Sequence, residues 1–113
     1  MTDEEIIRAF HAMWDNFPEP VSITQVSREI VAVNKVSASL GITPGMKCSQ
    51  IGDPAAHRGC RLNEAVSEQK TIAVTYEVPT GKAFAFWVPI AEHPGWVLHF
   101  NVGRRAVYEE LKR

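Results

Sequence analysis

The order of apolar and polar residues at the start of the chain predicts an amphipathic helix over residues 3–17. Thr2 and Glu5 have the spacing of a capping box, and Pro18 marks the end of the pattern. The apolar positions, which recur three or four residues apart, are Ile6, Ile7, Phe10, Met13, Trp14 and Phe17. This apolar surface is large for one short helix, so part of it is predicted to contact a second copy. The residues assigned to that dimer interface are Ile6, Ile7, Phe10, Met13 and Trp14.

The pattern then changes to short runs that are typical of strands. Two β-type runs, VSITQV and EIVAVN, flank a turn at Ser27 and Arg28 and predict a hairpin. Asn34 is the expected N-cap of a helix of about two turns, which Gly41 ends. Glycines and prolines interrupt residues 41–59, which are expected to form short, irregular segments.

In the second half of the chain, helical spacing over residues 60–70 is followed by a period of two. Three antiparallel strands are expected, with turns at 79–81 and 93–95. The even-numbered apolar residues are predicted to share one face, which looks inward: Ile72, Val74, Tyr76, Val78, Phe84, Phe86, Val88, Ile90, Trp96, Leu98, Phe100 and Val102. His99 would then lie on the opposite face, which is also apolar and needs a cover from the first helix or a second copy. Residues 104–113 are predicted to begin an outgoing helix.

Length and charge restrict the class of protein. A chain of 113 residues holds one ordinary domain. Its 12 Lys and Arg against 13 Asp and Glu provide no basic field for nucleic acid. No apolar run reaches the roughly 20 residues of a membrane span, and the acidic N-terminus is unlike a secretory signal. We therefore expect a cytoplasmic protein that binds neither nucleic acid nor membrane.

Several segments, taken in order, resemble a PAS domain. They are FPEPVSIT before the first strand, IVAVN before the short helix, PGMKC in the next loop, GCRLNEAVSEQKT over the long helix, and FWVPI and GWVLHFNVG in the last strands. The resemblance implies an α+β fold: a five-stranded antiparallel sheet in the order 2-1-5-4-3 with short helices over one face. Residues 1–17 would be an added N-terminal amphipathic helix, 18–103 the PAS core and 104–113 the start of a C-terminal helix.

The resemblance also implies a function. PAS domains act as sensory and dimerisation modules of bacterial signalling proteins, and they usually hold a small ligand between sheet and helices. We expect a homodimer that relays a change through its terminal helices to an output domain or partner, and no enzyme activity. The residues predicted to line the ligand cavity are Cys48, Tyr76, Phe86, Leu98 and Phe100. The cofactor is left open: His99 argues against haem if it faces away from the cavity, a non-covalent flavin remains possible, and so does a filled core.

The alternative is a thiol-based redox or metal-binding protein centred on Cys48, His57 and Cys60. Three ligands without a Cys-x-x-Cys pair predict no tetrahedral metal site. Cys60 lies between Arg58 and Arg61 near the expected start of a helix, which favours a thiolate. A buried thiol that only fills space is the competing interpretation.

Overall fold

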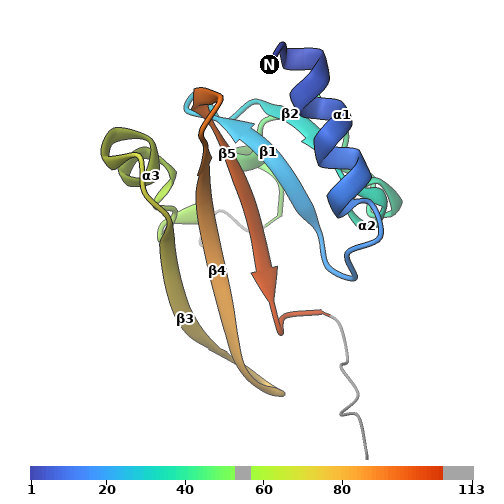
Figure 1. Ribbon diagram of the computed structural model, residues 1–113. Coiled ribbons are helices and arrows are strands. Elements are labelled where there is room, and N and C mark those ends of the chain that lie inside the picture. The colour runs from blue at the N-terminus through green and yellow to red at the C-terminus, as the bar shows by residue number, and fades with distance from the viewer. Residues whose placement is uncertain (53–56, 106–113) are drawn as a thin grey trace, which may run out of the picture.

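The computed structural model describes residues 1–52 and 57–105, and these form one sheet with helices on both sides (Figure 1). The elements in chain order are α1 (Asp3–Trp14), β1 (Val21–Gln25), β2 (Ile30–Val33), α2 (Lys35–Ser39), the single 3-10 turn η1 (Cys48–Gln50), α3 (Leu62–Glu68), β3 (Ile72–Val78), β4 (Gly81–Ile90) and β5 (His93–Val102). The strands are antiparallel and lie in the order β2-β1-β5-β4-β3. The predicted fold class and strand order are confirmed.

Local sequence signals set several boundaries. The Thr2 side chain accepts from the Glu5 amide and the Glu5 carboxylate accepts from the Thr2 amide, so the predicted capping box begins α1. The Asn34 side chain caps α2, and Gly41 follows that helix with φ +83°. The outgoing helix predicted for 104–113 lies mostly outside the described residues, and Arg104 and Arg105 form a bend.

One predicted turn is wrong. The chain turns at Ala91 and Glu92, because Ile90 pairs with His93, and residues 93–95 belong to β5. The register shifts between Pro89 and Ile90. A proline has no amide to give to the ladder, so the pairing is irregular there and the turn moves towards the N-terminus.

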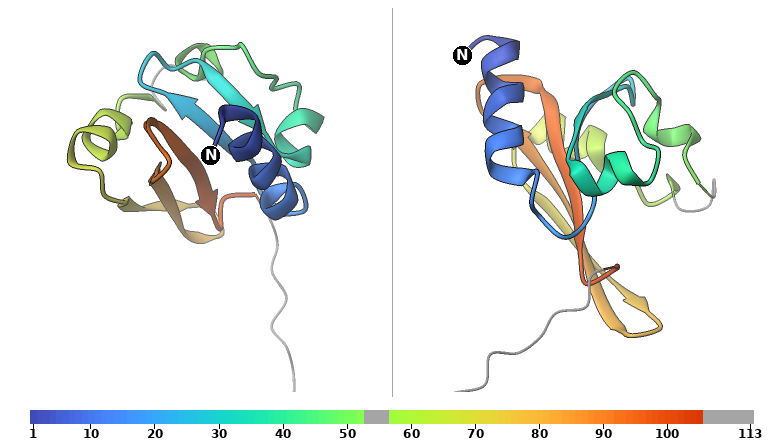
Figure 2. Two further views of the ribbon diagram at one scale, coloured as in Figure 1. Left: turned by 45° about the horizontal axis from the view of Figure 1, so that its top comes forward. Right: turned by 90° about the vertical axis from the view of Figure 1, so that its right-hand side faces the viewer.

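The sheet carries a different cover on each face (Figure 2). Helix α1 packs on one face with a cluster of buried residues that includes Ile6, Phe10, Val21 and Ile23. Helix α3 packs on the other face, where Leu62 and Ala65 meet Ile72, Ala85, Trp87 and Val97. No helix in the described ranges is long and apolar enough to cross a membrane.

Candidate functional site

The strand register decides which side chains share a face. Ile72 pairs with Trp87, and Trp87 pairs with His99, so residues of different parity lie side by side. The prediction that the even-numbered residues of all three strands face the same way is therefore wrong for β3 against β4 and β5. The sequence pattern fixed the alternation within each strand but not the pairing between strands.

We call the two sides the α1 face and the cleft face. The α1 face carries Phe84, Phe86, Leu98 and Phe100. The cleft face carries Val74, Tyr76, Ala85, Trp87, His99 and Asn101.

The residues predicted to line a ligand cavity do not all come together: only Cys48 and Phe100 border the same space. Phe86 and Phe100 stack on the α1 face with ring centroids 5.0 Å apart, and Leu98 packs in the same cluster. Tyr76 lies on the cleft face, and Cys48 borders a smaller space beside β1 and α2. A single site made of all five residues is therefore excluded by the register.

The cleft face contains a hollow of about 760 Å³. Its floor is low because β4 presents the small residue Ala85 beside Val74 of β3. Gly59 borders it, and Glu77 and Arg104 supply opposite charges to its lining. A cleft of this size with an apolar floor and a few polar groups has the usual features of a small-molecule site.

Tyr76 and Asn101 place polar atoms in this cleft. The Tyr76 hydroxyl donates to Asn101 Oδ1 over 2.6 Å. Asn101 Nδ2 has no partner among the described residues. The pair therefore presents a hydroxyl oxygen that accepts and an amide that donates.

His99 is the titratable side chain at the centre of the cleft face, and its position corrects the prediction that it points away from the cavity. Its Nδ1–H donates to the Phe86 carbonyl over 2.8 Å, so Nε2 is the bare nitrogen of the neutral ring. Burial lowers the pKa of His99, and the hydrogen bond to Phe86 opposes this effect without overcoming it. The ring is therefore a hydrogen-bond acceptor in the cleft at neutral pH.

Trp87 lies beside His99 with the rings 4.9 Å apart and nearly parallel. The Trp87 side chain is 5% exposed, and its Nε1–H has no hydrogen-bond partner within the described chain. Buried hydrogen-bond donors without partners are rare in native proteins, and a bound molecule is one explanation for such a donor.

The thiol and imidazole of the alternative hypothesis lie around a smaller space of about 150 Å³. Cys48 and His57 line it together with His99 and Asn101, which also line the cleft. Burial raises the pKa of the Cys48 thiol, and nearby Cys60 adds to this effect. Cys48 is thus a poor nucleophile. Cys48, His57 and Cys60 do not form a metal-binding group, and neither do any three His, Cys, Asp or Glu side chains within residues 1–52 and 57–105. Redox activity of Cys60 stays a prediction.

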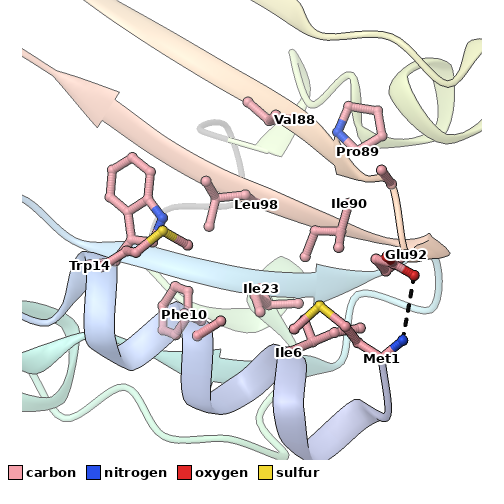
Figure 3. Close-up of a pocket in the computed structure, with 13 residues that line it drawn as sticks. Met1, Ile6, Phe10, Trp14, Ile23, Val88, Pro89, Ile90, Glu92 and Leu98 are labelled. Atoms are coloured by element: carbon pink, nitrogen blue, oxygen red, sulfur yellow. Dashed lines mark hydrogen bonds and ion pairs between the residues drawn. The ribbon is translucent and has the colours of Figure 1, made fainter.

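A second, apolar groove of about 240 Å³ runs between α1 and the strands β4 and β5 (Figure 3). Four residues of the predicted dimer interface line it: Ile6, Phe10, Met13 and Trp14. Ile6 and Phe10 are 6% and 3% exposed and pack on the sheet of their own protomer, so they have little surface left for a partner. Met13 is 71% exposed, and Ile7 and Trp14 are half-buried. Of the five residues predicted for a dimer interface, only Ile7, Met13 and Trp14 therefore have surface left for a partner.

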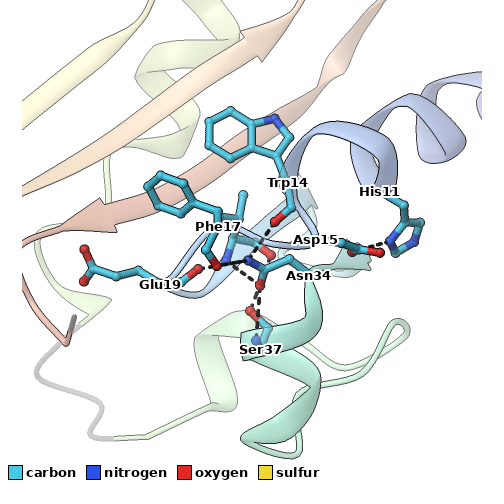
Figure 4. A network of polar contacts seen from close by, with 8 residues as sticks. His11, Trp14, Asp15, Phe17, Glu19, Asn34 and Ser37 are labelled. Atoms are coloured by element: carbon cyan, nitrogen blue, oxygen red, sulfur yellow. Dashed lines mark hydrogen bonds and ion pairs between the residues drawn. The ribbon is translucent and has the colours of Figure 1, made fainter. Parts of the chain in front are cut away.

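Asn34 joins the end of α1 to the start of the sheet (Figure 4). The residue is fully buried, and its Oδ1 accepts from the amides of Val21 and Ser37. Its Nδ2 donates to the carbonyl oxygens of Trp14, Phe17 and Glu19, the last over 2.9 Å. One side chain therefore fixes α1, the linker after it, β1 and α2 relative to one another.

Glu19 joins the same region to the exit from the sheet. Its fully buried carboxylate accepts from the amides of Gly103, Arg104 and Arg105 at 2.7, 2.9 and 2.8 Å. Gly103 has φ +87°, and a Cβ there would meet the Lys82 carbonyl at 2.9 Å, so only glycine fits. We call these contacts the Glu19 clasp.

Sequence reasoning did not include Glu19, Trp87, His99 or Asn101 among the residues of the candidate site. Asn34 was predicted as a cap but not as a junction. The signal for Glu19 was weak: a charged residue between Pro18 and Pro20 reads as an exposed linker. His99 and Asn101 alternate with large apolar residues on β5, and the correct pairing of β4 with β3 would have placed Tyr76 on their face.

Comparison with known proteins supports the fold. No protein-family model matches the chain, and no curated protein matches it. Two solved structures do resemble it. The PAS domain of a protein from Colwellia psychrerythraea has a TM-score of 0.56 and 20% identity, over 88% of this chain and 95% of that chain. A sensory box sensor histidine kinase from Vibrio cholerae has a TM-score of 0.55 and 16% identity, over 87% and 84% of the two chains. The chain thus has the fold of a PAS domain, with the strand order that this fold requires.

Proposed function

We propose that this protein is a sensory module of a signalling system. It binds a small molecule in the cleft and acts by binding rather than by catalysis. Occupancy of the cleft changes the exit from β5 and so reaches an output domain or partner. The fold supports this proposal, since one similar structure is that of a sensor histidine kinase.

The observation that best supports the proposal is that Arg104 belongs both to the cleft and to the Glu19 clasp. Arg104 lines the cleft, and its backbone amide is held by the Glu19 clasp. The Glu19 carbonyl is in turn bound by Asn34, which also holds the end of α1. A molecule that displaces Arg104 therefore acts on a continuous series of hydrogen bonds between the exit and the first helix.

A cleft-filling variant tests this relay without a ligand. Ala85→Leu adds a branched side chain to the cleft floor and imitates occupancy. We expect amide hydrogen exchange at residues 103–105 to change several-fold, because the clasp and the cleft share Arg104. Ala38→Leu adds the same side chain at an exposed position of α2 and is the control. Unchanged exchange at 103–105 in Ala85→Leu would refute the relay.

A second variant asks whether the clasp carries the effect. Glu19→Gln keeps the size of the side chain but removes its charge, so the three amides lose charge-assisted bonds. We expect exchange at 103–105 to rise by about tenfold, since 1.4 kcal/mol corresponds to that factor. Ala85→Leu should add little in this background. If it changed exchange as much as in the wild type, another route would be required.

The same proposal includes a homodimer formed through α1 and β4. Phe84 of β4 is 41% exposed, and Met13 of α1 is 71% exposed. Trp14 and Val88 lie on opposite walls of the groove between α1 and β4. Burial of these side chains by a second copy removes apolar surface from water, which stabilises association.

Light scattering after size exclusion measures the dimer directly. We expect the wild type to elute at twice the protomer mass, and Met13→Lys and Phe84→Lys to reduce that mass to one protomer. Val26→Lys replaces an apolar residue that is 46% exposed at the β1–β2 turn and should leave the dimer intact. A wild type that is monomeric at micromolar concentration would exclude this part of the proposal.

A further inference from the structure

We propose that the cleft binds a neutral nitrogen heterocycle with a lactam edge, in which an N–H lies beside a C=O. His99 Nε2 accepts from the N–H, and Asn101 Nδ2 donates to the C=O. This inference names the ligand class of the proposed sensory site and rests on that function.

The polar edge of the cleft provides one acceptor and one donor side by side. His99 and Asn101 are two residues apart on β5, so both side chains project from the same face. Each of these two side chains makes one hydrogen bond within the protein, which leaves His99 Nε2 and Asn101 Nδ2 available to a ligand. Phe86 takes the Nδ1–H of His99, and Tyr76 occupies Oδ1 of Asn101. A ligand that offered only acceptors or only donors would leave one of the two atoms unpaired, which is costly in a buried site.

The charges around the cleft favour a neutral ligand. Glu77 and Arg104 are the charged residues in the lining, and they have opposite signs. The His99 ring resists protonation because it is buried. The cleft therefore has no net charge with which to pay for the desolvation of an ion.

The floor of the cleft favours a flat ring. Ala85 and Val74 pair across β4 and β3 and form a low apolar patch, with Tyr76 and Trp87 as taller neighbours. A rigid planar molecule covers such a patch and loses little conformational entropy on binding. The indole of Trp87 adds a second flat apolar surface beside this floor.

Lumazine, a neutral pteridine-dione with lactam edges, is the probe, and 1,3-dimethyllumazine is its matched control without the N–H groups. Binding of each to the whole protein is measured by saturation-transfer NMR and calorimetric titration near neutral pH. We expect lumazine to bind about tenfold more tightly, because the dimethyl compound leaves His99 Nε2 unpaired. Equal affinities, or no binding of either compound up to millimolar concentration, would overturn the inference.

Two variants test whether side chains of β5 cause the preference for lumazine over 1,3-dimethyllumazine. His99→Phe removes the acceptor, and Asn101→Leu removes the donor with little change of volume. If one variant fails to fold, the other still tests the edge. In either variant the ratio between the two compounds should fall to about one, while His11→Phe, an exposed imidazole on α1, should keep it. If the ratio of the two affinities stayed near ten in both variants, the lactam edge would not bind to His99 and Asn101.

The outcomes for ligand class and for function can be separated. If lumazine fails but Ala85→Leu still alters exchange at residues 103–105, the sensory relay stands and the lactam assignment falls. If lumazine binds with the expected preference and exchange at 103–105 is the same with and without it, the cleft is a binding site that does not signal through the clasp.

Discussion

The α1 face and the cleft face belong to the same three strands, yet they differ in the size of the side chains that they present. The α1 face carries Phe86, Leu98 and Phe100; Leu98 and Phe100 pack in one cluster with α1, and Phe86 stacks on Phe100. The cleft face carries Ala85 at the corresponding place on β4, and a hollow remains there. Both faces are apolar by composition, so hydrophobicity does not explain why the hollow on the cleft face is larger than the groove beside α1. Side-chain volume does, because a closely packed face needs large residues to reach its cover.

The largest expected effect tests whether the α1 face is a true core. Phe10→Ala removes a ring that is 3% exposed, and we expect the free energy of unfolding to fall by about 3–5 kcal/mol. Met13→Ala, on the same helix at 71% exposure, should change it by less than about 0.5 kcal/mol. Urea denaturation of the dilute protein measures both. Similar losses would mean that α1 is not packed as described.

An intermediate effect compares the two faces with the same substitution. Ala32 is 1% exposed within the α1 cluster, and Ala32→Leu should destabilise the fold by about 1–3 kcal/mol through overpacking. Ala85→Leu inserts the same atoms where the cleft leaves room, so its cost should be below about 1 kcal/mol. Thermal and urea unfolding of the two variants decide the matter. A greater loss for Ala85→Leu would mean that the cleft is not free space.

The smallest effect concerns the titration of His99 on the cleft face. The pKa of unfolded His99 is about 6.5, and the folded pKa is lower because the ring is buried near His57 and Arg104. Above pH of about 6.5 both states are neutral and His99 makes no difference. As the pH falls towards the folded pKa, the unfolded state takes up the proton first, so stability is lost.

The slope of that loss is the measurable quantity. One proton contributes at most about 1.4 kcal/mol per pH unit to the free energy of unfolding. His99→Gln should reduce the slope below pH of about 6.5, whereas His11→Gln should retain it. Lumazine binding should weaken over the same range, because a protonated Nε2 no longer accepts. A slope that is equal in His99→Gln and wild type would contradict the buried, neutral ring.

The elements of the fold were predictable because their signals are local. The capping box of Thr2 and Glu5, the Asn34 cap and the period-two runs of the last strands each act within a few residues. The PAS resemblance then supplied the strand order, which no local signal contains.

The candidate site was not predictable for the opposite reason. Whether Tyr76 shares a face with Phe86 or with Trp87 depends on the register of β3 against β4, and both faces of β4 are apolar. The sequence analysis predicts that Phe86 and Phe100 line the cavity. In the structure these large rings stack on the α1 face instead. The Glu19 clasp spans 84 to 86 residues and leaves no pattern along the chain.

The long sequence separation between Glu19 and residues 103–105 affects the order of folding. A contact between residues so far apart closes almost the whole domain into a loop, and the entropy of closure is lost before the three hydrogen bonds form. The β4–β5 hairpin, joined by a two-residue turn, can form much earlier. We therefore expect the Glu19 carboxylate to dock late on the folding route, so that its removal would speed unfolding while the rate of refolding changes little.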